Sequence, residues 1–204
     1  MKTAWFNNNI LPALMLNPDF KPLQQSDHFA PLKKCFSDVQ GKKLLDLGCG
    51  AAEVYQTFKN FEYTGADLPH IIEEVAKKKN PTGNFIHFNA EKDDFSFLKY
   101  YDIILMNSFI SEVPGWYRIL LQVLYNSNGY IILHRQEVTD KPSYLEKYIT
   151  YGGLETVKSI INYDHLVGMF HMNDYQILYE EDSFPGNNTQ KTFLLRKNAE
   201  RLKE

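Results

Sequence analysis

The residues whose types and spacing favour chemistry begin with Asp46, Gly48, Gly50 and Ala52, which stand at every second position. The residues before Gly48 form a short apolar run typical of a strand, and those from Glu53 onward suit a helix. Glycines in the turn between them let the backbone reverse sharply and let a ligand approach it closely. The first turn of the helix also presents unpaired N–H groups. This segment therefore predicts a strand–turn–helix site for the polar part of a small ligand.

The spacing of the glycines indicates which ligand suits the turn. A dinucleotide fingerprint has a third glycine at the position of Glu53, where a carboxylate would meet a pyrophosphate badly. The pattern acidic-x-Gly-x-Gly-x-small resembles motif I of the class I S-adenosylmethionine-dependent methyltransferases instead. That resemblance implies a cofactor site that includes Asp46, Gly48, Cys49 and Gly50. The alternative is a turn in an unrelated α/β protein that needs its glycines only for chain reversal.

A second acidic residue, Asp67, follows the next apolar segment, residues 61–66. The residues after it, 69–78, are typical of a helix with proline in its first turn. A carboxylate at the tip of a second strand can accept hydrogen bonds from both hydroxyls of a ribose. The acid at this point does so in the family that the chain resembles, and the resemblance places Asp67 and Leu68 in the cofactor site. Asp67 also suits the alternative role of helix N-cap.

Two further strand ends carry residues that the resemblance assigns to the same site. Asn89 and Ala90 follow a predicted strand over residues 84–88, where the family often has an Asp-Ala pair that contacts adenine. The amide oxygen of Asn89 can accept a hydrogen bond from the adenine amino group, but a simple polar turn explains this segment equally well. Asn107 ends a continuous apolar run, as expected at the tip of a central parallel strand.

Methyl transfer from a sulfonium is an in-line displacement, so the protein mainly positions and desolvates the reactants. A general base is needed only where the acceptor must lose its proton early. The candidates for this role are Glu112, His134 and Tyr151, near predicted strand ends. Each has a structural alternative: Glu112 as the cap of a helix that begins near Gly115, His134 as a core histidine and Tyr151 as a packing residue.

The stretch 136–162 is long and shows no clear period, which is typical of a functional loop. It carries Tyr144, Tyr148 and Tyr151 beside Gly152 and Gly153, which would combine aromatic walls with a hinge. Because it follows a predicted fifth strand, it begins at the sheet edge where ligands bind in open α/β folds. We expect it to form the acceptor pocket or its lid; the alternative is that its tyrosines only cover a sheet edge.

The length, charge and cysteine content of the sequence limit the classes of function that it can have. The 204 residues suit one domain, with residues 1–40 as an N-terminal cap and 41–197 as the core. A net charge of −3 gives no electrostatic reason to expect nucleic acid or an anionic membrane as partner. The apolar runs are too short to span a bilayer. The two cysteines, Cys35 and Cys49, form no zinc or disulfide framework, so we expect no metal and a cytoplasmic location.

The predicted fold is a three-layer, doubly wound, Rossmann-like α/β sheet. It is mostly parallel and closes with an antiparallel hairpin made of two strands over 175–180 and 191–196. The function that the resemblance implies is methyl transfer from S-adenosylmethionine to a small-molecule acceptor. The alternative is a non-catalytic methyltransferase-like module, because Asn89 stands where the family often has an acid and Glu112 near where it has a histidine. Glu53 disfavours a nicotinamide dehydrogenase.

Overall fold

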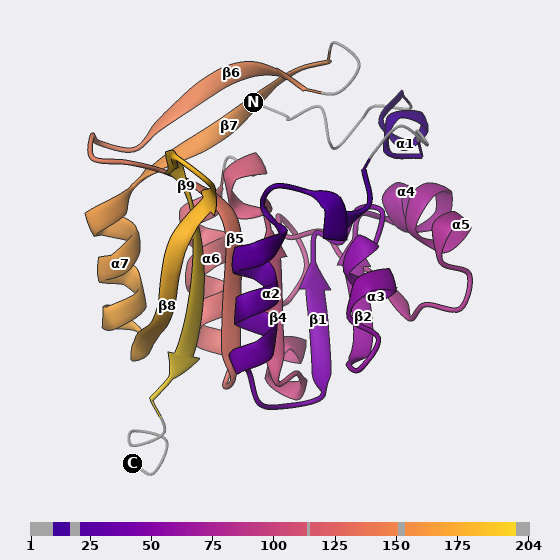
Figure 1. Cartoon of the computed structure of the whole chain (residues 1–204), viewed down its shortest axis with the longest axis horizontal. Helices are drawn as coiled ribbons and strands as arrows, with labels where there is room; N and C mark the ends of the chain where they lie inside the picture. Colours follow the sequence, from indigo (N-terminus) through magenta and orange to yellow (C-terminus); the bar gives the residue numbers. More distant parts are fainter. Residues whose placement is uncertain (1–9, 17–20, 114, 151–153, 199–204) are drawn as a thin grey trace.

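The computed structural model describes residues 10–16, 21–113, 115–150 and 154–198. In this part of the chain nine strands form one sheet with helices on both faces (Figure 1). The elements in chain order are α1 (Ile10–Met15), η2 (Leu23–Gln25), α2 (Phe29–Asp38), β1 (Lys43–Leu47), α3 (Glu53–Thr57), β2 (Glu62–Asp67), α4 (Pro69–Ile71), η3 (Ile72–Ala76), α5 (Lys77–Lys79), β3 (Phe85–His87), η4 (Ser96–Tyr100), β4 (Ile103–Asn107), η5 (Ile110–Glu112), α6 (Trp116–Asn126), β5 (Tyr130–Thr139), β6 (Tyr144–Thr150), β7 (Leu154–Asn162), α7 (Tyr163–Met172), β8 (Tyr175–Phe184) and β9 (Asn187–Lys197).

The sheet confirms the predicted doubly wound topology. Strands β3, β2, β1, β4 and β5 lie side by side in that order, and every pair among them is parallel. β9 adds to β5 in the antiparallel direction and β8 adds to β9, which makes the closing hairpin. The strand order reverses between β1 and β4, and in open α/β sheets the ligand crevice lies at such a switch point.

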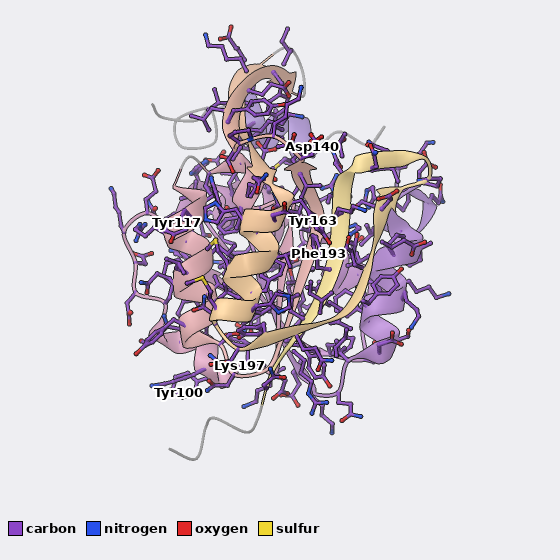
Figure 2. All side chains as sticks on the ribbon, turned by 90° about the vertical axis from the view of Figure 1, so that its left-hand side faces the viewer. Tyr100, Tyr117, Asp140, Tyr163, Phe193 and Lys197 are labelled. Atoms are coloured by element: carbon purple, nitrogen blue, oxygen red, sulfur yellow. The ribbon has the colours of Figure 1, made fainter. Side chains whose placement is uncertain are left out.

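The core has two parts, one on each face of the sheet. Side chains such as Leu45 and Ile104 pack against α6 and α7, whereas their neighbours Leu44 and Ile103 pack toward α2 and α3. Figure 2 shows the sheet from its α7 side, with Phe193 of β9 facing that helix. The alternation of side chains along a strand thus gives both faces an apolar surface, and the result is the three-layer arrangement.

The N-terminal residues lie in two places. α2 packs on a face of the sheet through Leu32 and Phe36. α1 lies beside the helical segment after β2, where Leu11 packs with Val75. That helical segment, 69–79, begins with a proline as predicted and contains one π-helical turn, η3. No helix among the described residues has both the length and the apolar character needed to cross a membrane.

The prediction of an aperiodic loop over 136–162 is wrong. β5 continues to Thr139, and β6 and β7 form an antiparallel hairpin that stands above the carboxyl edge of the sheet (Figure 1). β6 is an edge strand whose side chains are mostly exposed, so it lacks the apolar alternation of a half-buried strand. The hairpin joins the sheet where Val138 and Thr139 pair with the end of β7.

The sequence predicts a helix over 163–172, which is α7, with Asn162 as its N-cap and Asn173 as a left-handed residue that ends it. Asn162 caps its first turn, as expected, because its Oδ1 accepts a hydrogen bond from the His165 N–H at 2.8 Å. The prediction that Asn173 adopts a left-handed conformation is wrong, since its φ is −104°. The left-handed residue is the next one, Asp174, with φ of 63°.

Candidate functional site

A cavity of about 640 Å³ opens at the carboxyl ends of β1, β2, β4 and β5. Its volume lies within the usual range for a small-molecule site. One side, which we name the turn half, consists of Asp46, Gly48, Cys49, Gly50, Ala51, Asp67, Leu68, Ile71, Phe88 and Ala90. The opposite side, the hairpin half, consists of Asn107, Glu112, Arg135, Glu137, Tyr148, Ile149, Lys158 and Gln190. Met15 of α1 also lines the cavity.

The glycine turn has the backbone conformation that its sequence requires. Gly48 has φ of 79° and Gly50 has φ of 51°, values in the left-handed region that favours glycine. A Cβ atom on Gly48 would overlap the ring of Phe109. The N–H groups of Gly48 and Cys49 both donate to the carbonyl oxygen of Ala66, at 2.8 and 3.2 Å, and so bind the turn to the end of β2. The turn is therefore a narrow cradle fixed to the next strand.

Asp67 lies at the tip of β2 against this turn. Its Oδ2 accepts a hydrogen bond from the Gly50 N–H at 2.8 Å, and its Oδ1 accepts one from the Leu68 N–H at 2.7 Å. Burial raises the pKa of the Asp67 carboxyl, and these two hydrogen bonds oppose the rise. α4 begins after Leu68 with no side-chain cap, so Asp67 is not its N-cap. Each carboxylate oxygen has two lone pairs, so Asp67 retains capacity for ligand hydroxyls.

Asp46 is the most deeply buried acid of the turn half, with 2% of its surface exposed. The Tyr63 hydroxyl donates a hydrogen bond to its Oδ2 at 2.8 Å. Burial raises the pKa of Asp46 to about 7, against the effect of this hydrogen bond and with a contribution from the charge of Asp67. Cys49, beside it, is buried, and burial raises the pKa of its thiol well above the usual value. A neutral thiol is a weak nucleophile, which agrees with a packing role.

Asn89 does not line the cavity, although the residues on both sides of it, Phe88 and Ala90, do. Its Oδ1 accepts a hydrogen bond from the Glu91 N–H at 3.0 Å, which closes a local polar turn. The structure thus gives Asn89 the alternative role that its segment suggested. The carbonyl oxygen of Ala90 accepts a hydrogen bond from Arg118 of α6 at 2.8 Å, a contact that the sequence did not indicate.

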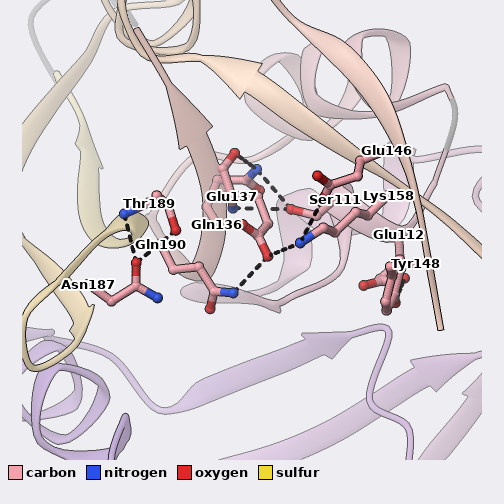
Figure 3. A network of polar contacts seen from close by, with 10 residues as sticks. All are labelled: Ser111, Glu112, Gln136, Glu137, Glu146, Tyr148, Lys158, Asn187, Thr189 and Gln190. Carbon is pink, nitrogen blue, oxygen red and sulfur yellow. Dashed lines mark hydrogen bonds and ion pairs between the residues drawn. The ribbon is translucent and has the colours of Figure 1, made fainter. Parts of the chain in front are cut away.

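A polar network fixes the hairpin half (Figure 3). Lys158 of β7 donates to Glu137 of β5 at 2.9 Å and lies 3.3 Å from Glu146 of β6. Gln190 of β9 donates to the same Glu137 oxygen at 2.7 Å. Burial acts to lower the pKa of Lys158, but its hydrogen bonds and the two carboxylates outweigh burial and raise it. Lys158 therefore stays charged and binds the hairpin to the sheet.

Glu112 lies in the cavity wall at the end of η5, close to the tip of β4. The Tyr148 hydroxyl donates a hydrogen bond to its Oε2 at 2.6 Å, and the Tyr148 ring lies under the Lys158 ammonium, 5.4 Å from the ring centroid. α6 has Gly115 as its N-cap and no side-chain cap, so Glu112 does not cap that helix. The structure brings Glu112 to the cavity and leaves its catalytic role a prediction.

The junction between the two halves is a contact between strand tips. Arg135 of β5 donates a hydrogen bond from Nε to Oδ1 of Asn107 at the end of β4, at 2.9 Å. Asn107 lines the cavity at this junction, as predicted for the tip of a central strand. Arg135 and Gln190 were not predicted as site residues, because they come from strands that meet only in the fold. Glu137 and Lys158 lie in the segment 136–162 that was expected on the acceptor side, but the sequence did not single them out.

His134 does not line the cavity and is 1% exposed. Its Nε2 lies 3.0 Å from Nδ1 of His28, and its Nδ1 lies 2.8 Å from the Thr192 hydroxyl. Burial lowers the pKa of His134 well below its usual value, and the charge of Arg135 acts in the same direction. His134 is thus a hydrogen-bonded core histidine, the alternative considered from the sequence. Tyr151, the third catalytic candidate, lies outside the described residues.

No protein-family model matches this chain, and no curated protein matches its sequence. Solved structures do match. A SAM-dependent methyltransferase from Methanosarcina mazei is similar with a TM-score of 0.60 and 17% identity over 79% of this chain and 95% of that chain. An S-adenosylmethionine-dependent methyltransferase from Mesorhizobium loti has a TM-score of 0.65 and 12% identity over 86% and 100%. The SAM-bound amino pentose methyltransferase from Micromonospora echinaspora has a TM-score of 0.63 and 11% identity over 89% and 99%.

These structures match the chain over most of their length, and its described residues contain the predicted doubly wound sheet and closing hairpin. The chain therefore has the Rossmann-like fold of the class I S-adenosylmethionine-dependent methyltransferases.

Proposed function

We propose that this protein binds S-adenosylmethionine in the turn half and transfers its methyl group to a small-molecule acceptor in the hairpin half. The observation that carries the proposal is the meeting of the glycine turn and Asp67 at one cavity. The left-handed glycine turn, in which Gly48 packs directly against the Phe109 ring, fits a methionine tail. An acid at the tip of β2 fits ribose hydroxyls.

S-adenosylmethionine supplies a methyl carbon bonded to a positively charged sulfur, so a good leaving group is already present. The residues of this chain would then hold and orient the two reactants and keep water away from them. Asp46, Gly48, Cys49, Gly50, Asp67, Leu68 and Ala90 are the residues that we assign to the cofactor. Asn107 would stand at the boundary with the acceptor.

The acceptor that we propose is small because one cavity must hold both reactants. The β6–β7 hairpin lies above the hairpin half, and its Tyr148 and Ile149 line the cavity. We assign this hairpin, together with the extension of β5, to the acceptor side, in place of the loop expected from the sequence. Met15 extends the wall of the cavity from the N-terminal residues. This contact supports a role for α1 as part of a cover over the cofactor.

A second candidate function is binding without catalysis. It is favoured by Asn89, whose side chain closes a local turn and does not line the cavity. Such a module would bind S-adenosylmethionine or no ligand, work through protein contacts and show no methyl transfer to any acceptor.

Titration calorimetry with S-adenosylhomocysteine, S-adenosylmethionine and NAD tests the cofactor assignment. We expect a dissociation constant on the order of micromolar for the first two, about −8 kcal/mol, and no heat with NAD. Asp67→Asn should weaken binding about ten- to a hundredfold, because a charged acceptor of ribose hydroxyls is lost. Glu155→Asn, an exposed site on the hairpin, is the control. Tighter binding of NAD than of S-adenosylmethionine would overturn the proposal.

A further inference from the structure

We propose that this protein selects the base of its cofactor through one ring nitrogen, without reading the 6-amino group, and that Arg118 is a positioning residue for this contact. The group that would meet the ring nitrogen is the backbone N–H of Ala90. The inference rests on the proposed function and adds to it how the base is selected.

The order of the strands gives the base its place in the cavity. β1, β2 and β3 lie side by side and run parallel, so their carboxyl ends follow one another along one edge of the sheet. The glycine turn follows β1, and Asp67 ends β2. A cofactor with its methionine tail in the turn and its ribose at Asp67 would extend its base toward the end of β3. Phe88 and Ala90 line the cavity at that end.

Asn89 lies between these two residues in the sequence, but its side chain serves the turn that follows β3. It does not line the cavity, and its Oδ1 accepts a hydrogen bond from the Glu91 N–H at 3.0 Å. The described side chains that line this end of the cavity, those of Leu68, Phe88 and Ala90, have no hydrogen-bond acceptor. The 6-amino group of an adenine would therefore meet no side-chain acceptor there.

The peptide between Ala90 and Glu91 is held at both of its polar atoms. Nη2 of Arg118 donates to the Ala90 carbonyl oxygen at 2.8 Å. On the other side of the same peptide, the Glu91 N–H donates to Asn89 as described above. Because a trans peptide is planar and its N–H and C=O point in opposite directions, these two bonds fix the orientation of the peptide. Arg118 makes its contact from the first turn of α6, and so ties the turn after β3 to that helix.

The preceding peptide leaves one donor for a ligand. The carbonyl oxygen of Asn89 accepts from the N–H groups of Lys92 and Asp93, at 2.9 and 2.8 Å, inside the turn. The Ala90 N–H belongs to the same trans peptide and therefore points the opposite way, out of the turn. The hydrogen bonds of the described residues include none from this N–H, although Ala90 is only 6% exposed. A buried N–H without a partner is rare, so an acceptor on the ligand is expected here.

A single N–H donor selects an acceptor and is indifferent to substituents elsewhere on the ring. Adenine offers ring nitrogens as acceptors. Replacing the nitrogen that faces Ala90 by C–H would leave a buried N–H unpaired, which is costly. Removing the 6-amino group would break no hydrogen bond to a side chain.

Calorimetric titration with analogues of S-adenosylhomocysteine tests the inference. The 1-deaza, 3-deaza and 7-deaza analogues each replace one ring nitrogen by C–H, and the purine analogue replaces the 6-amino group by hydrogen. We expect one deaza analogue to bind about tenfold more weakly than S-adenosylhomocysteine. The other two deaza analogues and the purine analogue should bind within about threefold of it.

Arg118→Met separates positioning of the N–H from a merely structural role. It removes the donor to the Ala90 carbonyl oxygen, so the peptide is no longer fixed and the loss with the sensitive deaza analogue should shrink from about tenfold to about threefold. Arg118→Lys keeps a charged donor and should restore part of that loss. Arg196→Met is the control, because it removes an exposed arginine at the opposite edge of the sheet, beside the start of β5. It should keep the wild-type ratios.

Asn89→Asp tests whether this side chain reads the base. The carboxylate can still accept the hydrogen bond from the Glu91 N–H, so the turn is preserved. We expect the ratio of the affinities for S-adenosylhomocysteine and its purine analogue to stay within about twofold of the wild-type ratio. A ratio raised about tenfold would show that residue 89 contacts the 6-amino group, against the inference.

The outcomes separate this inference from the proposed function. If the wild-type protein fails to bind S-adenosylhomocysteine, the proposed function itself is wrong. If it binds this ligand, three results would each overturn the inference about the base alone. They are a set of deaza analogues in which none or more than one is weakened, a purine analogue weakened about tenfold, and wild-type ratios in Arg118→Met.

Discussion

The two halves of the cavity are built in different ways. The turn half comes largely from one short stretch after β1 and from the end of β2, and it presents backbone in addition to two acids. The hairpin half draws on η5, β5, β6, β7 and β9, and side chains hold it together through one ion-paired network. The difference implies that backbone shape should determine cofactor binding, whereas charge pairing should determine how firmly the acceptor side is held.

Gly48→Ala should have the largest effect and should act on the turn half. Its φ of 79° strains any other residue by about 1–2 kcal/mol, and the added Cβ would overlap Phe109. We expect a loss of about 3 kcal/mol in the free energy of unfolding and at least a hundredfold loss of affinity for S-adenosylhomocysteine. Gly186→Ala is the control, since its φ is 74° and a Cβ there meets nothing within 4 Å. Equal affinity losses in both variants would show that backbone strain alone is responsible.

Lys158→Met should loosen the hairpin half without changing the turn half. It leaves the buried Glu137 carboxylate with the hydrogen bond from Gln190 (Figure 3). Losing one member of a buried ion pair is costly, and we expect about 2 kcal/mol here because Gln190 still donates. Hydrogen exchange over 144–162 should quicken, while affinity for S-adenosylhomocysteine stays within about twofold. Lys147→Met breaks an exposed pair with Glu155 and should cost under about 0.5 kcal/mol.

The pH dependence of stability allows a comparison between Asp46 of the turn half and the hydrogen-bonded pair of His28 and His134. Burial lowers the pKa of His28 to about 4, so the histidine contribution to stability is present above pH 6.5 and is lost as pH falls toward 4. The pKa of Asp46 is raised to about 7, so its contribution is present at low pH and is lost as pH rises toward 7. The two groups act in opposite directions over almost the same window.

Asp46→Asn should therefore make the free energy of unfolding fall more steeply as the pH is lowered. Removal of this carboxyl takes away about one proton from the folded state between pH 4.5 and 6.5, which changes the slope by about 1.4 kcal/mol per pH unit. Urea unfolding at pH 4.5, 5.5 and 6.5 would measure the slope for both proteins. Parallel slopes would mean that Asp46 is ionised throughout this range. Asp38→Asn, an exposed acid on α2, serves as the control.

Asn162→Ala should have the smallest effect and should act at the base of the hairpin. The side chain caps α7 and also donates to the carbonyl oxygen of Lys141 at 3.0 Å. Loss of an N-cap costs about 1 kcal/mol, and we expect a similar fall in the free energy of unfolding. Thermal unfolding would measure it, with Asn173→Ala at the other end of the helix for comparison. An unchanged melting temperature would contradict the capping role.

The sequence predicted the turn half well because adjacent residues determine its local backbone conformation. Gly48 and Gly50 need left-handed backbone, and Asp67 follows a buried run at the expected distance. It predicted the hairpin half poorly because those side chains meet only after β5, β7 and β9 pair. Tyr148, Ile149, Val157 and Ile160 are β-forming residues, and Gly152 and Gly153 separate them. This composition was a usable signal for a hairpin, but the exposed edge strand β6 concealed it.

The extra residue in β5 has a consequence for insertions and deletions. Before Arg135, the odd-numbered side chains Ile131 and Leu133 pack toward α6 and α7; after it, the even-numbered Val138 does so. The bulge at Arg135, where φ is 54°, thus shifts the alternation of side chains along the strand by one residue. Deleting this one residue would leave Val138 on the same face as Leu133, because four positions would then separate the two. Flattening the bulge without a deletion would instead turn Val138 toward the ligand and Glu137 toward the apolar layer. The end of β5 would therefore keep its polar and apolar faces if the extra residue were lost, but would exchange them if that residue entered the regular pairing.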